Sequence, residues 1–271
     1  MLSLFRIHRL IDRVAELPPL KPLLEMRYDG KFASNRRANL FRGVFHSYDA
    51  AQASAPEARP LGYDNDDAAS MYMHRTRKIF PSDYPLLFWL EKLMAAGNRR
   101  ILDLGVHIGV SYYAYRKYLD YPSDLRWTVH DVPAVMARGR ELASSYDEIK
   151  QLDFCDRFED GKDAQILLAA GSLQYLSDTL AERLLKTDSL PSHLLLNHLP
   201  MHARQSYFTL QSIGTAFCPY RIFGMDEFIH GFEAAGYQLV DRWENPEKSC
   251  FIPFHPEHSL DRYYGFYFRR N

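Results

Sequence analysis

The hydrophobic and polar positions follow two periods that alternate along the second half of the chain. Short apolar runs, typical of buried strands, are separated by longer segments in which apolar residues recur every three or four positions, as in amphipathic helices. We expect strands at 101–104, 125–130, 149–154, 164–170, 193–197, 237–243 and 263–269.

Helices are expected between these strands. The pattern favours helices over 111–119, from 133 to about 145, from about 177 to 186, and over 225–235. Alternating strands and helices predict a parallel sheet with helices on both faces. The last two strands have no helix between them, which suggests a reversed last strand. The predicted fold is therefore α/β, a doubly wound Rossmann-like sheet of seven strands.

The first 97 residues predict a mostly helical extension in front of this sheet. Residues 1–17 have helical spacing, and the helix would either pack on the domain or lie on a membrane surface. Residues 23–62 look irregular apart from a short helix capped by Ser47. Further helices are expected over 64–79 and 84–96. The predicted domains are an extension or lid at 1–97 and a Rossmann-like domain at 98–271.

The strongest motif runs from Asp103 to Gly109, where a strand, a glycine turn and a helix follow one another. A ligand binds such a unit where the strand ends, against the positive end of the helix. The turn lacks the G-x-G-x-x-G of dinucleotide sites and the Gly-Lys-Ser/Thr of a Walker loop. Its spacing, Asp103-x-Gly105-x-His107-x-Gly109, resembles the acidic glycine turn of class I S-adenosylmethionine-dependent methyltransferases. A carboxylate there can hold the ammonium group of the cofactor, and His107 stands where a glycine is usual.

Two further strand ends carry candidate cofactor ligands. Asp131 ends the second strand, about 20 residues after the glycine turn, where an acidic residue can hold a ribose. The alternative is an ordinary helix start. At the end of the third strand, Asp153 could accept from the adenine amine and Phe154 could pack on the ring, although a plain loop acid fits as well.

The acceptor is expected beside the ends of strands four and five. Ser172 and Gln174 follow the fourth strand, and His198 and His202 follow the fifth. A histidine is the usual base for a hydroxyl acceptor, so His198 or His202 is the candidate catalytic base, with surface or structural roles as the alternative. Tyr72, His74 and the aromatic segment 203–223 could roof this space.

Composition narrows the class of protein. The chain has 33 basic and 34 acidic residues, so no basic field favours nucleic acid as a partner. Its three cysteines are far apart in sequence, which favours a reducing cytoplasm and predicts no metal cluster. No apolar run reaches the roughly 20 residues of a membrane span.

Several segments together resemble a family of methyltransferases often encoded with bacterial surface-polysaccharide genes. They are 41–45 with 62–64, the turn 103–109, 171–176, 197–200, 219–221 and 264–265. The resemblance covers most of the chain after residue 40. It implies a class I fold, S-adenosyl-L-methionine as cofactor and a small-molecule or glycan acceptor. An arginine is common in that family where His198 stands here.

Two other functions remain open from the sequence. One is a nucleotide-binding oxidoreductase or nucleotide-sugar enzyme on the same architecture, which the missing dinucleotide motif disfavours. The other is a non-catalytic relative that keeps the fold and binds a partner, which His107 in the turn would suit.

Overall fold

The computed structural model describes residues 20–34, 39–62, 64, 73–147, 149–187 and 189–271. Its contacts divide the chain into two compact units. The first unit comprises the described parts of 1–62, 200–227 and 246–263, and the second those of 63–199, 228–245 and 264–271. This grouping differs from the predicted boundary at residue 97, which stays a prediction. The helix expected over 1–17 lies outside the described residues.

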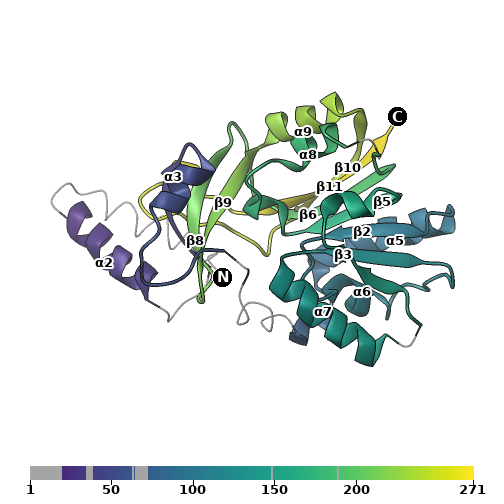
Figure 1. The fold of residues 1–271 in the computed structure, drawn as a ribbon. Helices are drawn as coiled ribbons and strands as arrows, with labels where there is room; N and C mark the ends of the chain where they lie inside the picture. Colours follow the sequence, from purple (N-terminus) through teal and green to yellow (C-terminus); the bar gives the residue numbers. More distant parts are fainter. Residues whose placement is uncertain (1–19, 35–38, 63, 65–72, 148, 188) are drawn as a thin grey trace. The chain divides into compact units, whose positions relative to one another are not determined.

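The second unit contains the predicted seven-stranded sheet. Its order is β10-β11-β6-β5-β2-β3-β4 (Figure 1). The strands β2 to β6 pair in parallel, and β11 pairs antiparallel with β6. This confirms the doubly wound Rossmann-like sheet and its reversed last strand. The bounds are β2 Arg100–Leu104, β3 Arg126–His130, β4 Leu152–Phe154, β5 Ile166–Ala170, β6 His193–Leu199, β10 Tyr237–Asn245 and β11 Tyr263–Arg270.

Helices cover both faces of this sheet. Side chains alternate between the faces along a strand, and β11 shows the result. Phe266 and Phe268 contact Phe228 of α9, whereas the intervening Tyr267 contacts Trp89 of α5. The helices are α5 Tyr84–Ala95, α6 Val110–Tyr115, α7 Pro133–Tyr146, α8 Leu180–Leu185 and α9 Met225–Ala234, with 3-10 turns η1 Met73–Arg77, η2 Pro81–Asp83, η3 Phe158–Gly161 and η4 Leu173–Tyr175.

Some predicted helices in this unit differ from those observed. The helix α6 ends at Tyr115, four residues before the expected end at 119. Of the helix expected over 64–79, residues 65–72 lie outside the described part, and the rest includes only the 3-10 turn η1. The helix expected over 84–96 is confirmed as α5, and Gly97 follows it with a left-handed φ of 95°.

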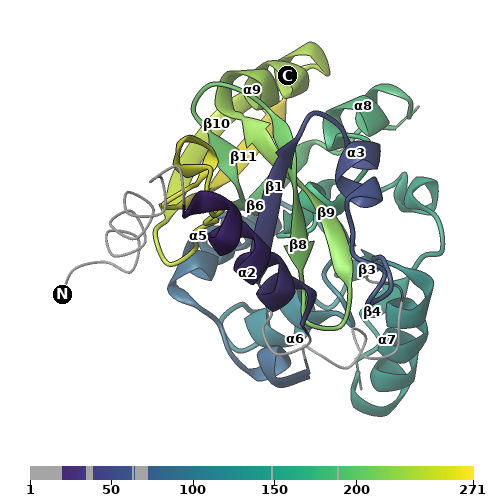
Figure 2. The same ribbon diagram turned by 90° about the vertical axis from the view of Figure 1, so that its left-hand side faces the viewer.

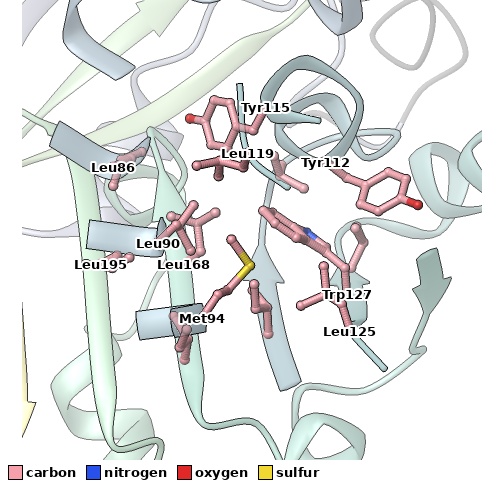
Figure 3. Close-up of a cluster of buried hydrophobic side chains, with 14 of the residues drawn as sticks. Leu86, Leu90, Met94, Tyr112, Tyr115, Leu119, Leu125, Trp127, Leu168 and Leu195 are labelled. Carbon is pink, nitrogen blue, oxygen red and sulfur yellow. The ribbon is translucent and has the colours of Figure 1, made fainter. Parts of the chain in front are cut away.

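The main core of the second unit lies against α5 and α6. Trp127 of β3 is fully buried there with Leu90, Tyr112 and Leu168 (Figure 3). The Trp127 indole is the largest fully buried side chain described. It contributes both apolar area, a stabilising term of a few kcal/mol, and a hydrogen-bond donor that the core must satisfy.

The first unit contains a second sheet, which the sequence did not predict. Its order is β1-β8-β9-β7, and Figure 2 shows β1, β8 and β9 side by side. The expectation of irregular structure over 23–62 is wrong, because a helix and a strand form there. The aromatic segment 203–223 consists largely of β8 and β9. The bounds are α2 Lys21–Ala33, β1 Leu40–Phe45, α3 Tyr48–Ala53, β7 Met201–His202, β8 Tyr207–Ser212, β9 Phe217–Gly224 and η5 Pro256–His258.

The sequence pattern did not predict the strand β1, because its local backbone is irregular. Gly43 has a φ of 72°, and the register with β8 shifts between Arg42 and Phe45. Such a bulge breaks the alternation of apolar and polar positions on which strand prediction depends. The short helix after it is confirmed, since the Ser47 side chain accepts a hydrogen bond from the N–H of Ala50 at the start of α3. Among the described helices, none is both long and apolar enough to cross a membrane.

Candidate functional site

The turn after β2 has a left-handed backbone at three alternate positions. Gly105, His107 and Gly109 have φ values of 69°, 68° and 89°, and Gly109 is the residue before α6. Glycine adopts this conformation without strain, whereas a residue with a Cβ does so at a cost of about 1–2 kcal/mol. The predicted glycine turn is therefore present, and His107 takes a backbone conformation suited to glycine.

Gly105 brings the ends of β2 and β5 into contact. A Cβ built on Gly105 would overlap the side chain of Ser172. The Ser172 hydroxyl donates to the carbonyl of Leu104 across 2.6 Å. The first glycine of the turn is thus required by close packing as well as by its φ, and the predicted site residue Ser172 lies directly against the turn.

Asp103 is a fully buried carboxyl group with one unused oxygen. Its Oδ2 accepts a hydrogen bond from the Trp127 indole across 3.0 Å. Its Oδ1 has no hydrogen-bond partner among the described residues. Burial raises the pKa of the Asp103 carboxyl well above its usual value, and the bond from Trp127 opposes this only in part. A buried acceptor of this kind suits a cationic donor such as an ammonium group.

Asp131, at the end of β3, is held by two backbone donors. Its Oδ2 accepts from the N–H of His107 and its Oδ1 from the N–H of Val132, each across 2.7 Å. Burial raises the pKa of Asp131, and these two bonds oppose the shift. Each carboxylate oxygen keeps a further lone pair, so the group can still accept from two hydroxyls.

Asp153 and Phe154 are the last residues of β4, and their side chains lie in different surroundings. Asp153 is exposed, and its Oδ1 accepts from the N–H of Phe154. The Phe154 ring is buried against α7, where a Cβ on Gly139 would overlap it. The ring is thus part of the core, and the roles of both residues in adenine binding stay predictions.

Gln174 carries a second buried acceptor near the end of β5. Its Nε2 donates to the carbonyl of Gly171 across 2.8 Å. Its Oε1 has no hydrogen-bond partner among the described residues, and the side chain is only 3% exposed. Buried amide oxygens are rarely left without a donor, so the Oε1 of Gln174 is a candidate acceptor for a ligand.

His198, at the end of β6, faces a buried carboxylate. Its Nε2 lies 3.7 Å from Oδ1 of Asp83, and the Oδ2 of Asp83 accepts from the N–H of Phe80 across 2.8 Å. Burial would raise the pKa of Asp83, but these interactions with His198 and Phe80 outweigh it and lower the pKa. His198 has a left-handed φ of 57° and its Cβ lies beside Gly171.

Asn197 fixes the strand just before His198. Its Nδ2 donates to the carbonyl of Ser82, and its Oδ1 accepts from the Trp243 indole and the Asn245 amide at 3.0 and 2.8 Å. The amide thereby connects the end of β6 to the residue next to Asp83. This network orients the backbone on both sides of the His198–Asp83 pair.

His202 belongs to the first unit. Its Nδ1 accepts from the N–H groups of Arg204 and Gln205, and its Nε2 lies 3.2 Å from the carbonyl of Glu257. Both ring nitrogens therefore contact backbone groups. Its catalytic role stays a prediction, as does the roof, for which Tyr72 lies outside the described residues.

Sequence reasoning missed Asp83 and Trp127. Asp83 looked like part of a helix break in Pro81-Ser82-Asp83, and Trp127 like an ordinary strand residue. Their partners, His198 and Asp103, are far away in sequence, and no spacing rule connects them. The only available signal was that a buried carboxyl and a buried indole each need a polar partner.

A cavity of about 770 Å³ lies elsewhere in the second unit, among η1, α6 and α7. It is lined by Thr76, Arg77, Tyr113, Arg116, Lys117, Leu142 and Tyr146. None of the predicted site residues is among these described lining residues.

No protein-family model matches the chain, and no curated protein matches it. Solved structures with a similar fold include a 1,6-didemethyltoxoflavin-N1-methyltransferase from Burkholderia thailandensis, at 17% identity over 70% of this chain and 79% of that one, with a TM-score of 0.45. An S-adenosylmethionine-dependent methyltransferase from Mesorhizobium loti is 15% identical over 70% and 98%, with a TM-score of 0.45. The magnesium protoporphyrin IX methyltransferase of Synechocystis is 10% identical over 78% and 89%, with a TM-score of 0.47.

At these identities and TM-scores the likeness carries no argument about function. The fold class rests on the sheet itself, whose parallel strands β4-β3-β2-β5-β6 are closed by the reversed β11 and the edge strand β10. The second unit therefore has a doubly wound, Rossmann-like fold.

Proposed function

We propose that the protein is an S-adenosylmethionine-dependent methyltransferase that acts on a hydroxyl of a small molecule or glycan. The observation that carries the proposal is a pair of buried carboxyl groups at the ends of neighbouring strands. Asp103 lies in β2 and Asp131 directly follows β3, and the two strands pair in parallel up to Leu104 and His130. The glycine turn between them is bonded to Asp131 through His107.

The two carboxyl groups favour a cationic ligand over a pyrophosphate. Asp103 has an oxygen without a hydrogen-bond partner near the end of β2, next to the turn where a dinucleotide would place its phosphates. An ammonium group there would stabilise the ionised form of Asp103, whereas a phosphate would favour its neutral form. The ammonium of S-adenosylmethionine suits Asp103, and the ribose hydroxyls suit Asp131. Gln174 would offer its buried Oε1 to the same ligand, and Asp153 would meet the adenine amine. When bound, this cofactor supplies an electrophilic methyl group on its sulfonium.

His198 is the proposed base for the acceptor hydroxyl. Its Nε2 faces Asp83, whose carboxylate stays ionised at neutral pH because its pKa is lowered. A carboxylate beside an imidazole stabilises the charged form of the ring, so His198 can take up a proton. Asp83 does not need to touch the acceptor for this, and we describe it as a positioning residue. We prefer His198 to His202, whose ring nitrogens contact backbone groups.

The finer parts of the proposal rest on the sequence. A hydroxylated acceptor is expected from the polar residues at the ends of strands four and five together with the aromatic segment 203–223. A role in polysaccharide biosynthesis is expected from the resemblance to the polysaccharide-associated methyltransferases. A lid formed within residues 1–97 follows from their position before the sheet. Location in the cytoplasm is supported by Cys155, Cys218 and Cys250, which are free thiols.

One observation supports a second candidate function. His107 occupies a left-handed position in the turn, where its side chain stands in place of a glycine hydrogen. A non-catalytic protein that keeps the fold and binds a partner would tolerate a turn that the histidine partly fills.

Calorimetry on the full chain separates these functions. We expect one equivalent of S-adenosylhomocysteine or S-adenosylmethionine to bind and NAD to show no heat. Binding of NAD alone would contradict the proposal in favour of an oxidoreductase. Binding of none of the three would support the non-catalytic alternative. With cofactor binding established, transfer of tritiated methyl to a panel of sugars and nucleotide sugars identifies the acceptor class.

A further inference from the structure

The loop between β10 and β11 gathers three potential metal ligands. His255, Glu257 and His258 each offer one donor atom, and these atoms all lie within 4.8 Å of one another. All three belong to the first unit, and the methyltransferase proposal uses none of them. From this cluster we infer that the protein has a Zn²⁺ site with two imidazoles and one carboxylate as ligands.

The local backbone explains why the two imidazoles converge. Glu257 and His258 lie in the 3-10 turn η5, and His255 is the residue just before it. In a 3-10 helix, side chains three residues apart lie above one another. The sequence His-Pro-Glu-His therefore places both rings on one side of the turn, with the carboxylate beside them.

The loop holds this arrangement without help from a metal. Cys250 and Leu260 pair through two backbone hydrogen bonds that close it. Within it the Ser259 hydroxyl accepts from the N–H of Ile252 and donates to the carbonyl of His255. A site formed by a closed loop loses less conformational entropy when it binds its ligand.

Neighbouring side chains fix the ring of His258. It packs edge-on against Tyr207, with the ring centroids 4.9 Å apart, and the Tyr207 hydroxyl donates to its carbonyl. On another side it lies parallel to the ring of His202. Its Nδ1 is 2.8 Å from the Glu257 carboxylate. The rings of Tyr207 and His202 therefore restrict the orientation of the His258 imidazole.

The donor set selects the metal. Two imidazoles and a carboxylate are common zinc ligands, bound at about 2.0–2.2 Å. Tetrahedral coordination at that length separates donors by about 3.4 Å, so the side chains need only close inward by about 1 Å. Three protein ligands leave a position open to water or to another ligand, as in zinc sites that are not purely structural.

The test uses the full chain, stripped with EDTA and titrated with zinc chloride in a calorimeter. We expect one equivalent of Zn²⁺ to bind. His255→Gln and Glu257→Gln should each weaken the affinity at least tenfold, since even losses outside the ligand set cost 10- to 100-fold. His230→Gln is the matched control, because His230 and Glu233 form an exposed pair on α9 3.9 Å apart, and it should bind as the parent does.

Two outcomes would overturn the inference. One is that the parent binds no stoichiometric Zn²⁺ in the micromolar range. The other is that His255→Gln and Glu257→Gln bind it as tightly as the parent, which would assign the heat to other surface histidines. Circular dichroism checks that each variant is folded. Neither His255 nor Glu257 packs against Tyr207 as His258 does, so these two variants carry the test even if His258→Gln fails to fold.

Discussion

The backbone N–H of His107 donates to Oδ2 of Asp131 across 2.7 Å. This bond depends on the left-handed conformation of His107, because the turn must bend back toward the end of β3. The residue that departs from the usual glycine pattern therefore keeps the backbone function of that glycine. Compared with glycine, His107 adds a side chain and backbone strain, and mutation can distinguish the effects of these two additions.

Replacing His107 tests that separation. A left-handed backbone costs a residue with a Cβ about 1–2 kcal/mol, so His107→Gly should be more stable to urea than His107→Ala by about 1 kcal/mol. If the side chain blocks the turn, the glycine variant binds S-adenosylhomocysteine more tightly than the parent, as the non-catalytic alternative requires. Unchanged or weaker binding would count against that alternative.

Substitution of Gly105 should destabilise the protein much more than substitution of Gly97, which also has a left-handed backbone. Gly105→Ala adds both backbone strain and an overlap with Ser172. Gly97 has a φ of 95°, but no described atom lies within 4 Å of the position that a Cβ would take there, so Gly97→Ala adds strain alone, about 1 kcal/mol. Urea unfolding should show the larger loss for Gly105→Ala. Equal losses would mean that the ends of β2 and β5 are not in close contact.

We expect the buried carboxyl of Asp103 to contribute to cofactor binding while lowering the stability of the folded protein. Its pKa is raised by burial, so the folded state holds a proton that the unfolded chain releases above about pH 4. The contribution of this carboxyl is most favourable below that pH and declines as the pH rises toward its folded pKa. Asp103→Asn should therefore differ least from the parent in stability below about pH 4 and exceed it increasingly as the pH rises.

The same variant should bind S-adenosylhomocysteine about tenfold or more weakly, because a charge-assisted hydrogen bond is lost. Calorimetry and urea unfolding on one preparation give both results. A variant that is more stable and binds as tightly as the parent would show that Asp103 is not a cofactor ligand.

Asp83 should set the protonation of His198. Its carboxylate favours the charged ring, so Asp83→Asn should lower the pKa of His198. NMR titration of the histidine rings measures this without an acceptor, and His193, at the other end of β6, is the internal control. With an acceptor in hand, the acid limb of kcat/KM should move to lower pH. If the pKa of His198 is the same in Asp83→Asn and in the parent, Asp83 does not influence the protonation of His198.

The same change has a signature in stability. The pKa of Asp83 is lowered in the folded protein, so its stabilising contribution is present above about pH 4 and is lost as the pH falls. Asp83→Asn should therefore destabilise the protein at pH 7 and progressively less as the pH falls below about 4, the reverse of the trend for Asp103→Asn.

The sequence predicts the large sheet well and the small one poorly, for physical reasons. Buried parallel strands such as 166–170 are continuous apolar runs bounded by helices, and that pattern is plain. The strand 40–45 contains a left-handed Gly43 and a bulge, which remove the alternation. Its partner, the strand 207–212, follows about 160 residues later in the chain and pairs in turn with 217–224.

The site residues also divide into those that a local pattern predicts and those that depend on contacts between distant parts of the sequence. Asp103, Gly105 and Asp131 were found because a local motif places them at strand ends. Asp83 was not, because its link to His198 spans more than 100 residues and arises only from packing. The cluster at 255–258 is local in sequence, yet its significance depends on a 3-10 turn that the pattern did not reveal.

The central claim is that Asp131 holds the ribose of the cofactor, and calorimetry with S-adenosylhomocysteine tests it most directly. Asp131→Ala should weaken binding by about 1.5–3 kcal/mol, roughly 10- to 150-fold. Asp124→Ala is the control, since Asp124 precedes the same strand at its other end and pairs with Arg99 at the surface, and it should bind as the parent does. Equal affinity of Asp131→Ala and the parent would contradict the account.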